Sequence, residues 1–207
     1  MARSLCASCR QCRREGCKLF LKGERCTTKK CAMERRPVKP GQHGANRKVT
    51  FTEYGTQLRE KQKITRMYGI LEKQMHGYYE EADRLKGKTG ENLLILIERR
   101  LDNVVFRMGI AASRAQARQI VNHGLICVNG KNVDIASYQV KAGDVISIKD
   151  NKTEKEPIKA LKGVKIVMPK WVEFSTESLT GKVLALPTRE DIDADINEQL
   201  VVELYSR

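Results

Sequence analysis

The sequence has no long hydrophobic run. No stretch of 18 apolar residues occurs anywhere, and the first residues, MARSLCASCRQCRR, have no apolar core of the kind that a secretory signal needs. Aromatic residues are few, at 5%, although a hydrophobic content of 41% is adequate for a buried core. We therefore expect no membrane span and a chain that stays in the reducing cytoplasm, where disulfides are rare.

Acidic residues are scarce at the start of the chain. Residues 1–50 hold 14 Lys and Arg but only 3 Asp and Glu, so most of the formal net charge of +14 lies there. Such a lopsided excess is not typical of a merely solvated surface. It predicts a polyanionic partner, and it favours nucleic acid over a membrane surface.

Six of the seven cysteines lie in the same basic segment, within the first 31 residues. Cys9 and Cys12 form one close pair, and Cys26 and Cys31 form another after 13 intervening residues. Two close pairs of thiols suit the tetrahedral coordination of zinc, and bound metal would supply the folding energy that so short a segment lacks. We expect the neighbouring Lys and Arg to lower the pKa of these thiols and so to favour the coordinating thiolates.

The spacing alone leaves other assignments open. Cys6 and Cys9 could serve as the first pair instead. Cys6, Cys9, Cys12 and Cys17 are spaced C-x2-C-x2-C-x4-C, close to the run that holds an iron–sulfur cluster, although the last gap is one residue longer and no proline follows. A redox-sensing role is a third alternative. Cys127 lies in a β-like stretch and is interpreted as a small core residue.

Local patterns predict helices first and strands later. Apolar spacings of three and four predict a helix that ends near Gly69, a second closed by Gly87, and a third that begins at Thr89. Ser113, with Gln116 three residues on, has a capping-box spacing, and Gly124 is placed to end that helix.

The β-like stretches follow these helices. Asn129-Gly130 between two β-branched runs predicts a hairpin. The stretch YQVKAGDVISI predicts a further strand, a turn and a third strand, and VEFS and KVLALP are strand-like. The acidic tail is expected to face solvent or another protein; its carboxylates are Glu190, Asp191, Asp193, Asp195 and Glu198.

The predicted fold class is α+β. We expect a metal-bound, cysteine-rich basic segment with its linker over residues 1–48 and a helical domain over 49–98. An RNA-binding module of a helix-turn-helix-like pair with a small antiparallel sheet should cover 99–150. A connector, strands and the acidic tail, packing back on the domains, should cover 151–207.

The module at residues 100–149 resembles the small RNA-binding module named after bacterial ribosomal protein S-four. Dispersed segments are similar to that ribosomal protein family almost from end to end, among them CRREG, LKGERC, PGQHG, LREKQK, SRAQARQIV and NEQLVVELYSR. The resemblance implies a non-enzymatic constituent of the small ribosomal subunit. Such a protein binds rRNA directly and nucleates assembly of a multi-helix junction in the 5′ domain.

The resemblance implies further partners and ligands. It implies contact with ribosomal protein S-five, a place near the mRNA entry channel, and an influence on translational accuracy. The metal-binding branch of the family implies one structural zinc ion on Cys9, Cys12, Cys26 and Cys31; the iron–sulfur alternative stays open.

The expected RNA contacts are basic side chains that read the backbone and shape of folded RNA, because the groove of an A-form helix is too deep and narrow for side chains to read. From the front segment and its linker they are Arg3, Arg10, Arg13, Arg14, Lys18, Lys22, Arg25, Lys30, Arg35, Arg36, His43, Arg47 and Lys48. From the helices and the module they are Arg59, Lys61, Lys63, Arg66, Arg114, Arg118, His123 and Lys131, with Arg114 and Arg118 together on an outer helix face.

A catalytic role is the alternative to this interpretation. Pseudouridine synthases carry the same module and a catalytic aspartate in an R-L-D motif, which Arg100-Leu101-Asp102 matches. Three letters are a weak signal, and the chain has no separate domain large enough for that catalytic fold. Asp102 is better interpreted as a helix-start residue, favoured there by the helix dipole.

Overall fold

The structure, a computed structural model, describes residues 6–44, 50–149, 168–192 and 195–207. Its α-helices and its five-stranded antiparallel sheet confirm the α+β prediction. Arg3, Arg47, Lys48, Asp193 and the predicted connector over 151–165 lie outside the described residues.

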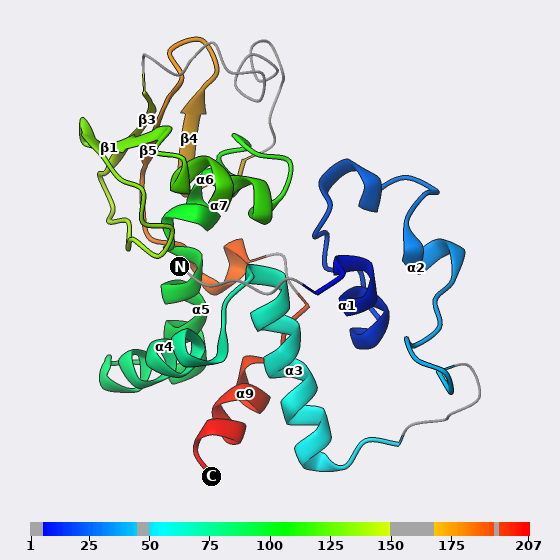
Figure 1. The fold of residues 1–207 in the computed structure, drawn as a ribbon. Coiled ribbons are helices and arrows are strands. Elements are labelled where there is room, and N and C mark those ends of the chain that lie inside the picture. The colour runs from blue at the N-terminus through cyan, green and yellow to red at the C-terminus, as the bar shows by residue number, and fades with distance from the viewer. Residues whose placement is uncertain (1–5, 45–49, 150–167, 193–194) are drawn as a thin grey trace. The chain divides into compact units, whose positions relative to one another are not determined.

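The chain divides into two compact units. Unit 1 comprises Met1–Leu93 with Ala194–Arg207, and unit 2 comprises Leu94–Asp193. The elements of unit 1 are helical: α1 (Ser8–Glu15), the short 3-10 helix η1 (Gly23–Cys26), α2 (Ala32–Arg35), α3 (Glu53–Tyr68), α4 (Glu72–Arg84) and α9 (Glu198–Tyr205) (Figure 1). Helix α5 (Thr89–Glu98) runs across the boundary between the units.

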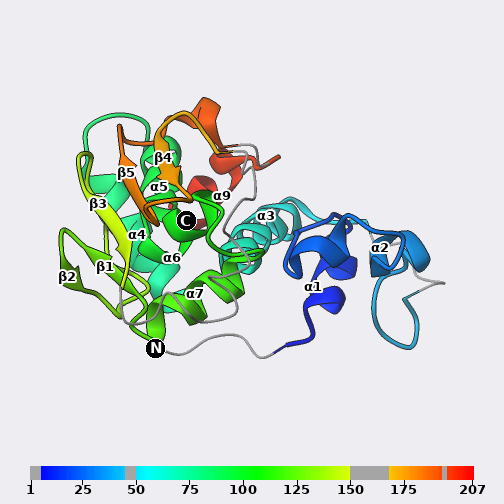
Figure 2. The same ribbon diagram turned by 90° about the horizontal axis from the view of Figure 1, so that it is seen from above.

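Helix α3 is the central element of unit 1, and local signals define both of its ends. The hydroxyl oxygen of Thr52 accepts a hydrogen bond from the backbone N–H of Gly55 at 3.2 Å. Gly69, with a φ of +64°, ends the helix in the left-handed conformation, as predicted. The C-terminal helix α9 lies along α3 (Figures 1 and 2), and Ile64 and Val201 are fully buried. Helix α9 therefore packs on α3, while Glu190 and Asp195 of the acidic tail are exposed, as expected.

Unit 2 combines a helix pair with a sheet. Its elements are α6 (Leu101–Arg107), α7 (Arg114–Asn122), β1 (Ile126–Val128), β2 (Lys131–Asn132), β3 (Val145–Ile148), β4 (Val172–Ser175), β5 (Thr180–Val183) and the 3-10 helix η3 (Arg189–Asp191). The strands are antiparallel in the order β2-β1-β3-β5-β4. Apolar side chains of α6, α7 and the sheet form one hydrophobic core.

Several predicted signals of unit 2 are confirmed. The hydroxyl oxygen of Ser113 accepts a hydrogen bond from the N–H of Gln116 at 3.3 Å, at the start of α7. Gly124, with a φ of +62°, follows the end of α7. Asn129 and Gly130 both have positive φ in the turn between β1 and β2, as a two-residue hairpin turn requires.

Two expectations for unit 2 are wrong. The stretch that begins at Tyr138 forms no strand; an isolated bridge between Arg100 and Gln139 stands in its place. Cys127 is half-buried, whereas its neighbours Ile126 and Val128 are buried, so its side chain lies on the sheet face away from the core.

Candidate nucleic-acid interface

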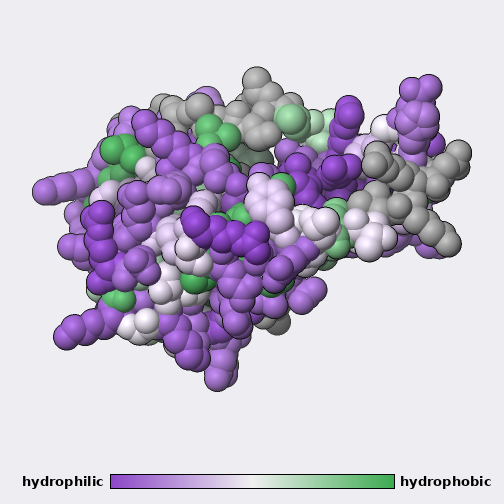
Figure 3. Space-filling view, turned by 90° about the horizontal axis from the view of Figure 1, so that it is seen from below, coloured by the Kyte–Doolittle hydropathy of each residue, from purple (hydrophilic) through white to green (hydrophobic). Residues whose placement is uncertain are grey.

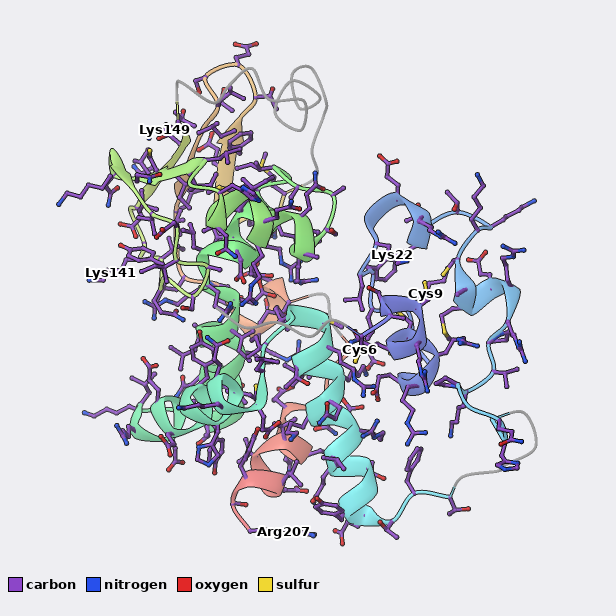
Figure 4. The ribbon with its side chains drawn as sticks, viewed as in Figure 1. Cys6, Cys9, Lys22, Lys141, Lys149 and Arg207 are labelled. Atoms are coloured by element: carbon purple, nitrogen blue, oxygen red, sulfur yellow. The ribbon has the colours of Figure 1, made fainter. Side chains whose placement is uncertain are left out.

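The cysteine-rich segment brings the two predicted thiol pairs together. Cys9 and Cys12 lie one turn apart on α1, Cys26 ends η1, and Cys31 precedes α2. All four line one pocket, together with apolar and basic neighbours that include Leu21, Lys22, Arg25 and Met33. In Figure 4, Cys9 lies on α1 and Lys22 on the stretch that leads into η1. Neither Cys6 nor Cys17 lines this pocket. Its cysteines are thus the four that were predicted to bind zinc, and not the four whose spacing is close to that of an iron–sulfur site.

The structure does not confirm a metal site. Within the described residues, no group of three or more His, Cys, Asp or Glu side chains has an arrangement that could hold a metal ion. The predicted lowering of the thiol pKa is also wrong for Cys12. Burial raises the pKa of this thiol, and the three other thiols of the pocket raise it further, against a hydrogen bond from the Leu19 backbone that lowers it.

Most basic side chains of the cysteine-rich segment are exposed, and two of them, Lys22 and Arg25, line this pocket. Arg13 and Lys18 are half-buried, and Lys18 pairs with Glu34. The other described residues predicted to contact RNA from this segment are exposed: Arg10, Arg14, Lys22, Arg25, Lys30, Arg35, Arg36 and His43.

The basic residues of α3 do not all point outward. Arg59 and Arg66 both donate to the buried carboxylate of Glu15 on α1. Lys63 lies 3.6 Å from Glu60 and 3.7 Å from Asp195. In each of these pairs, a basic residue that was predicted to contact RNA has an acidic partner within the protein.

The prediction that Lys61 contacts RNA from the exposed polar side of α3 is wrong. Lys61 is buried, and its Nζ donates to Oε2 of Glu72 at 2.6 Å. The hydroxyl of Tyr205, on α9, donates to the other oxygen of the same carboxylate at 2.8 Å. Partial burial raises the pKa of Glu72, but these two hydrogen bonds, together with the charges of Lys61 and His76, outweigh it and hold the pKa below its usual range. Lys61 therefore helps to attach the C-terminal helix to α3.

In unit 2, Arg114 and Arg118 do not form the predicted outer pair. Only 7% of the Arg118 side chain is exposed, and its Nη1 lies 4.0 Å from the Asp102 carboxylate. Arg114 is half-buried; its Nε donates to Oδ1 of Asn103 at 2.8 Å, and its guanidinium lies 4.6 Å from the centre of the Phe106 ring. The face of α7 that carries both arginines therefore lies against the polar side chains Asp102 and Asn103 of α6. His123 and Lys131, in contrast, are exposed.

Asp102 is part of a buried ion pair with Arg100. It lies in the first turn of α6, as predicted, and is buried. Arg100 holds it with two hydrogen bonds, from Nε at 3.0 Å and from Nη2 at 2.7 Å. A carboxylate held in this way is not available to a nucleobase, so the match to the R-L-D motif carries no catalytic meaning here.

Sequence reasoning missed two polar residues of this network. Glu98 is buried at the end of α5, where Arg107 donates to it at 2.7 Å and the Asn103 amide at 2.5 Å. Glu98 stands in the apolar run LLILIER, and a lone acid at such a position was the available signal for a buried ion pair. Asn103 gives no signal in the sequence, because its partners come from separate elements.

The face of the molecule in Figure 3 is covered mainly by hydrophilic residues, with hydrophobic ones in small scattered groups. None of the helices in the described ranges combines the length and apolarity that crossing a bilayer requires.

Known proteins match the chain over its whole length. Residues 4–98 match the family described as "Ribosomal protein S4/S9 N-terminal domain", and residues 99–146 match the "S4 domain". Small ribosomal subunit protein uS4 of Ruminiclostridium cellulolyticum is 57% identical over 209 residues, and that of Acetivibrio thermocellus is 58% identical over 209 residues. Protein uS4A of Clostridium novyi is 57% identical over 207 residues, and each alignment covers 100% of both chains. Proteins of this kind are structural and non-enzymatic, which agrees with the prediction that the chain is not an enzyme. The chain belongs to the bacterial uS4 family of small-subunit ribosomal proteins.

Proposed function

We propose that the chain is a structural constituent of the small ribosomal subunit in the cytoplasm and binds its rRNA directly. The observation that carries the proposal is the set of exposed Lys and Arg side chains of the cysteine-rich segment, which holds most of the net charge. Phosphate groups brought together by folded RNA repel one another, and these cations offset the repulsion while releasing counterions. Recognition is of backbone and junction shape.

The experiment measures binding of the full chain to a transcript of the 5′ domain of small-subunit rRNA over a range of salt concentrations. Wild type is expected to prefer this transcript to an unrelated structured RNA of equal length and to lose affinity steeply as salt rises. Equal affinity for the two RNAs, or no binding at moderate salt, would overturn the proposal.

A pair of variants tests which surface is used. Changing Lys22, Arg25 and Lys30 to Gln removes three exposed charges from the cysteine-rich segment and should reduce the salt slope by about two to three. The matched control changes Lys73, Arg84 and Lys86 to Gln, three exposed charges in or just after α4 that carry no RNA assignment. Equal effects of the two triple variants would count against the cysteine-rich segment as the interface.

The finer roles implied by the family resemblance belong to the same proposal. They are nucleation of a multi-helix junction in the 5′ domain, contact with ribosomal protein S-five, a position near the mRNA entry channel and an influence on accuracy. Membership of the uS4 family supports them. Small subunits reconstituted without the chain should lack chemical protection of that junction, and a junction that folds normally without it would refute the nucleation role.

A structural zinc ion on Cys9, Cys12, Cys26 and Cys31 is also part of the proposal. Its support is that these four thiols line one pocket while Cys6 and Cys17 do not. A bound zinc ion would cross-link α1, η1 and the start of α2, and the residues would have to draw closer and lose their thiol protons.

Elemental analysis of the purified chain tests the metal. We expect about one zinc per chain in wild type and in Cys127→Ser, and a loss of metal and of RNA affinity in Cys26→Ser. If the purified chain contains iron and absorbs visible light, the iron–sulfur cluster is the correct assignment and zinc is not. Thiol-rich protein with neither metal would refute both.

A further inference from the structure

Glu15 is an unusual residue in its surroundings. It is one of 3 acidic residues among the first 50, and it ends helix α1 directly after Arg13 and Arg14. Only 2% of its side chain is exposed. A buried carboxylate is costly unless it is paired and hydrogen-bonded, so its partners decide what it does.

The partners of Glu15 come from another helix. Arg59 and Arg66 each donate through Nη1 to Oε1 of Glu15, Arg59 at a distance of 3.2 Å. The two arginines are seven residues apart on α3, so they lie two turns apart on one face. Helices α1 and α3 contact each other and lie side by side in Figures 1 and 2. Glu15 thus links the cysteine-rich segment to α3.

The guanidinium groups around Glu15 remain partly open to solvent. The Arg59 side chain is 21% exposed and that of Arg66 is 25% exposed, while Arg14, the residue before Glu15, is exposed. Burial lowers the pKa of Arg59, Glu15 raises it, and the like charges of Arg66 and Arg14 lower it again. The guanidinium groups of Arg14 and Arg66 are therefore both close enough to repel that of Arg59.

The charges of this group do not cancel. Three arginines against the Glu15 carboxylate leave an excess of two positive charges. Glu60 also acts on Glu15, but it has its own partner in Lys63 at 3.6 Å. Arginine suits phosphate because its planar fork donates two parallel hydrogen bonds, and a second anion would relieve the remaining repulsion.

We infer that Glu15 is a positioning residue, which docks the cysteine-rich segment on α3 and holds Arg14, Arg59 and Arg66 as one phosphate-binding cluster for the rRNA backbone. This inference rests on the proposed function and adds a residue and a direction of effect to it. Removing a negative charge near a polyanion should by itself strengthen binding. If Glu15 orients the arginines, its removal weakens binding instead.

The experiment compares full-length Glu15→Gln with Glu24→Gln in the salt-dependent binding assay. Both substitutions remove one negative charge from the same segment, but Glu24 is exposed. We expect Glu15→Gln to weaken binding about tenfold and to reduce the salt slope by about one to two, because the arginines lose their common orientation. Glu24→Gln should leave the affinity unchanged or raise it.

A third and a fourth variant separate positioning from general damage. They are Arg59→Gln with Arg66→Gln, and the triple variant that adds Glu15→Gln. If Glu15 acts through these arginines, adding Glu15→Gln to the double variant causes no further loss. If Glu15→Gln merely unfolds the segment, it weakens binding equally in both backgrounds, and the inference is overturned.

The outcomes also separate this inference from the proposed function. Failure of wild type to bind the 5′-domain transcript refutes the proposed function itself. Normal binding by wild type together with equal or tighter binding by Glu15→Gln refutes only the role of Glu15.

Discussion

Gly181 in β5 allows us to predict the effect of adding one carbon atom to unit 2. The residue is buried and pairs with Ile146 of β3 and Phe174 of β4. A Cβ at this position would lie 2.6 Å from the backbone oxygen of Glu173, 3.0 Å from Sδ of Met108 and 3.0 Å from Cδ2 of Phe174. The oxygen belongs to the backbone of the paired strand, so it moves only if β4 and β5 separate.

The magnitude of Gly181→Ala follows from two opposed effects. Overpacking of a well-packed site costs about 1–3 kcal/mol. Alanine also lowers the conformational entropy of the unfolded chain, which stabilises the folded state by about 0.4–1 kcal/mol. We therefore expect Gly181→Ala to lower the free energy of unfolding by about 1–2 kcal/mol.

The assay is urea unfolding of the full chain followed by tryptophan fluorescence. The chain has one tryptophan, Trp171, which is buried in the core of unit 2 directly before β4. Gly77→Ala in α4 is the control, because a Cβ there meets nothing within 4 Å and favours the helix. The control should leave the midpoint of the Trp171 transition unchanged. A midpoint for Gly181→Ala equal to or above that of wild type would refute the packing argument.

Three further substitutions test other contacts. Asp102→Asn removes the charge of the carboxylate that accepts two hydrogen bonds from the buried Arg100 guanidinium and should cost about 3–5 kcal/mol in the same assay; a loss under about 1 kcal/mol would contradict the pairing. Gly90→Ala places a Cβ 2.8 Å from Cγ of Glu198 and should loosen α9, seen as faster proteolysis of the C-terminus; unchanged proteolysis would contradict the close packing. The folded-state pKa of Glu72 is lowered, so its contribution to stability is present above pH about 4.5 and is lost as pH falls through the lowered pKa. Because 55% of the Glu72 side chain is exposed, the loss should be small, and it should be absent in Glu72→Gln when unfolding midpoints are compared over pH.

The elements that the sequence predicted correctly are those defined by contacts within a few residues. Ser113 caps α7 through the N–H three residues on, Gly69 ends α3, and Asn129-Gly130 turns the β1–β2 hairpin. Each of these signals is complete within a short window of sequence, so no tertiary information was needed.

The sheet order required information that no window contains. β3 pairs with β1 on one side and with β5, more than 30 residues later, on the other. The alternation in VEFS and KVLALP indicated strands, but not that they extend the sheet of the predicted module. The false strand at Tyr138 has the same cause, because strand propensity does not state whether a neighbouring strand is present.

The candidate site shows the same limit for charge. Helical spacing correctly placed Arg114 and Arg118 on one face, but it could not show that α6 lies against that face with Asp102 and Asn103. Lys61 was misplaced for the same reason, since Glu72 and Tyr205 are its neighbours only in the folded chain.

Two buried carboxylates of unit 2 therefore hold cations that the sequence alone leaves open to RNA. Glu98 binds Arg107, and Asp102 binds Arg100 with Arg118 nearby. Burial makes these pairs far less sensitive to salt than contacts at the surface. Glu15 differs, because its partners Arg59 and Arg66 stay partly exposed. The salt slope of RNA binding should thus follow the exposed cations of the cysteine-rich segment together with Arg59 and Arg66, and not the total of 39 Lys and Arg. A slope that changed equally when these cations and the buried arginines of unit 2 were substituted would mean that this division of the charges does not operate.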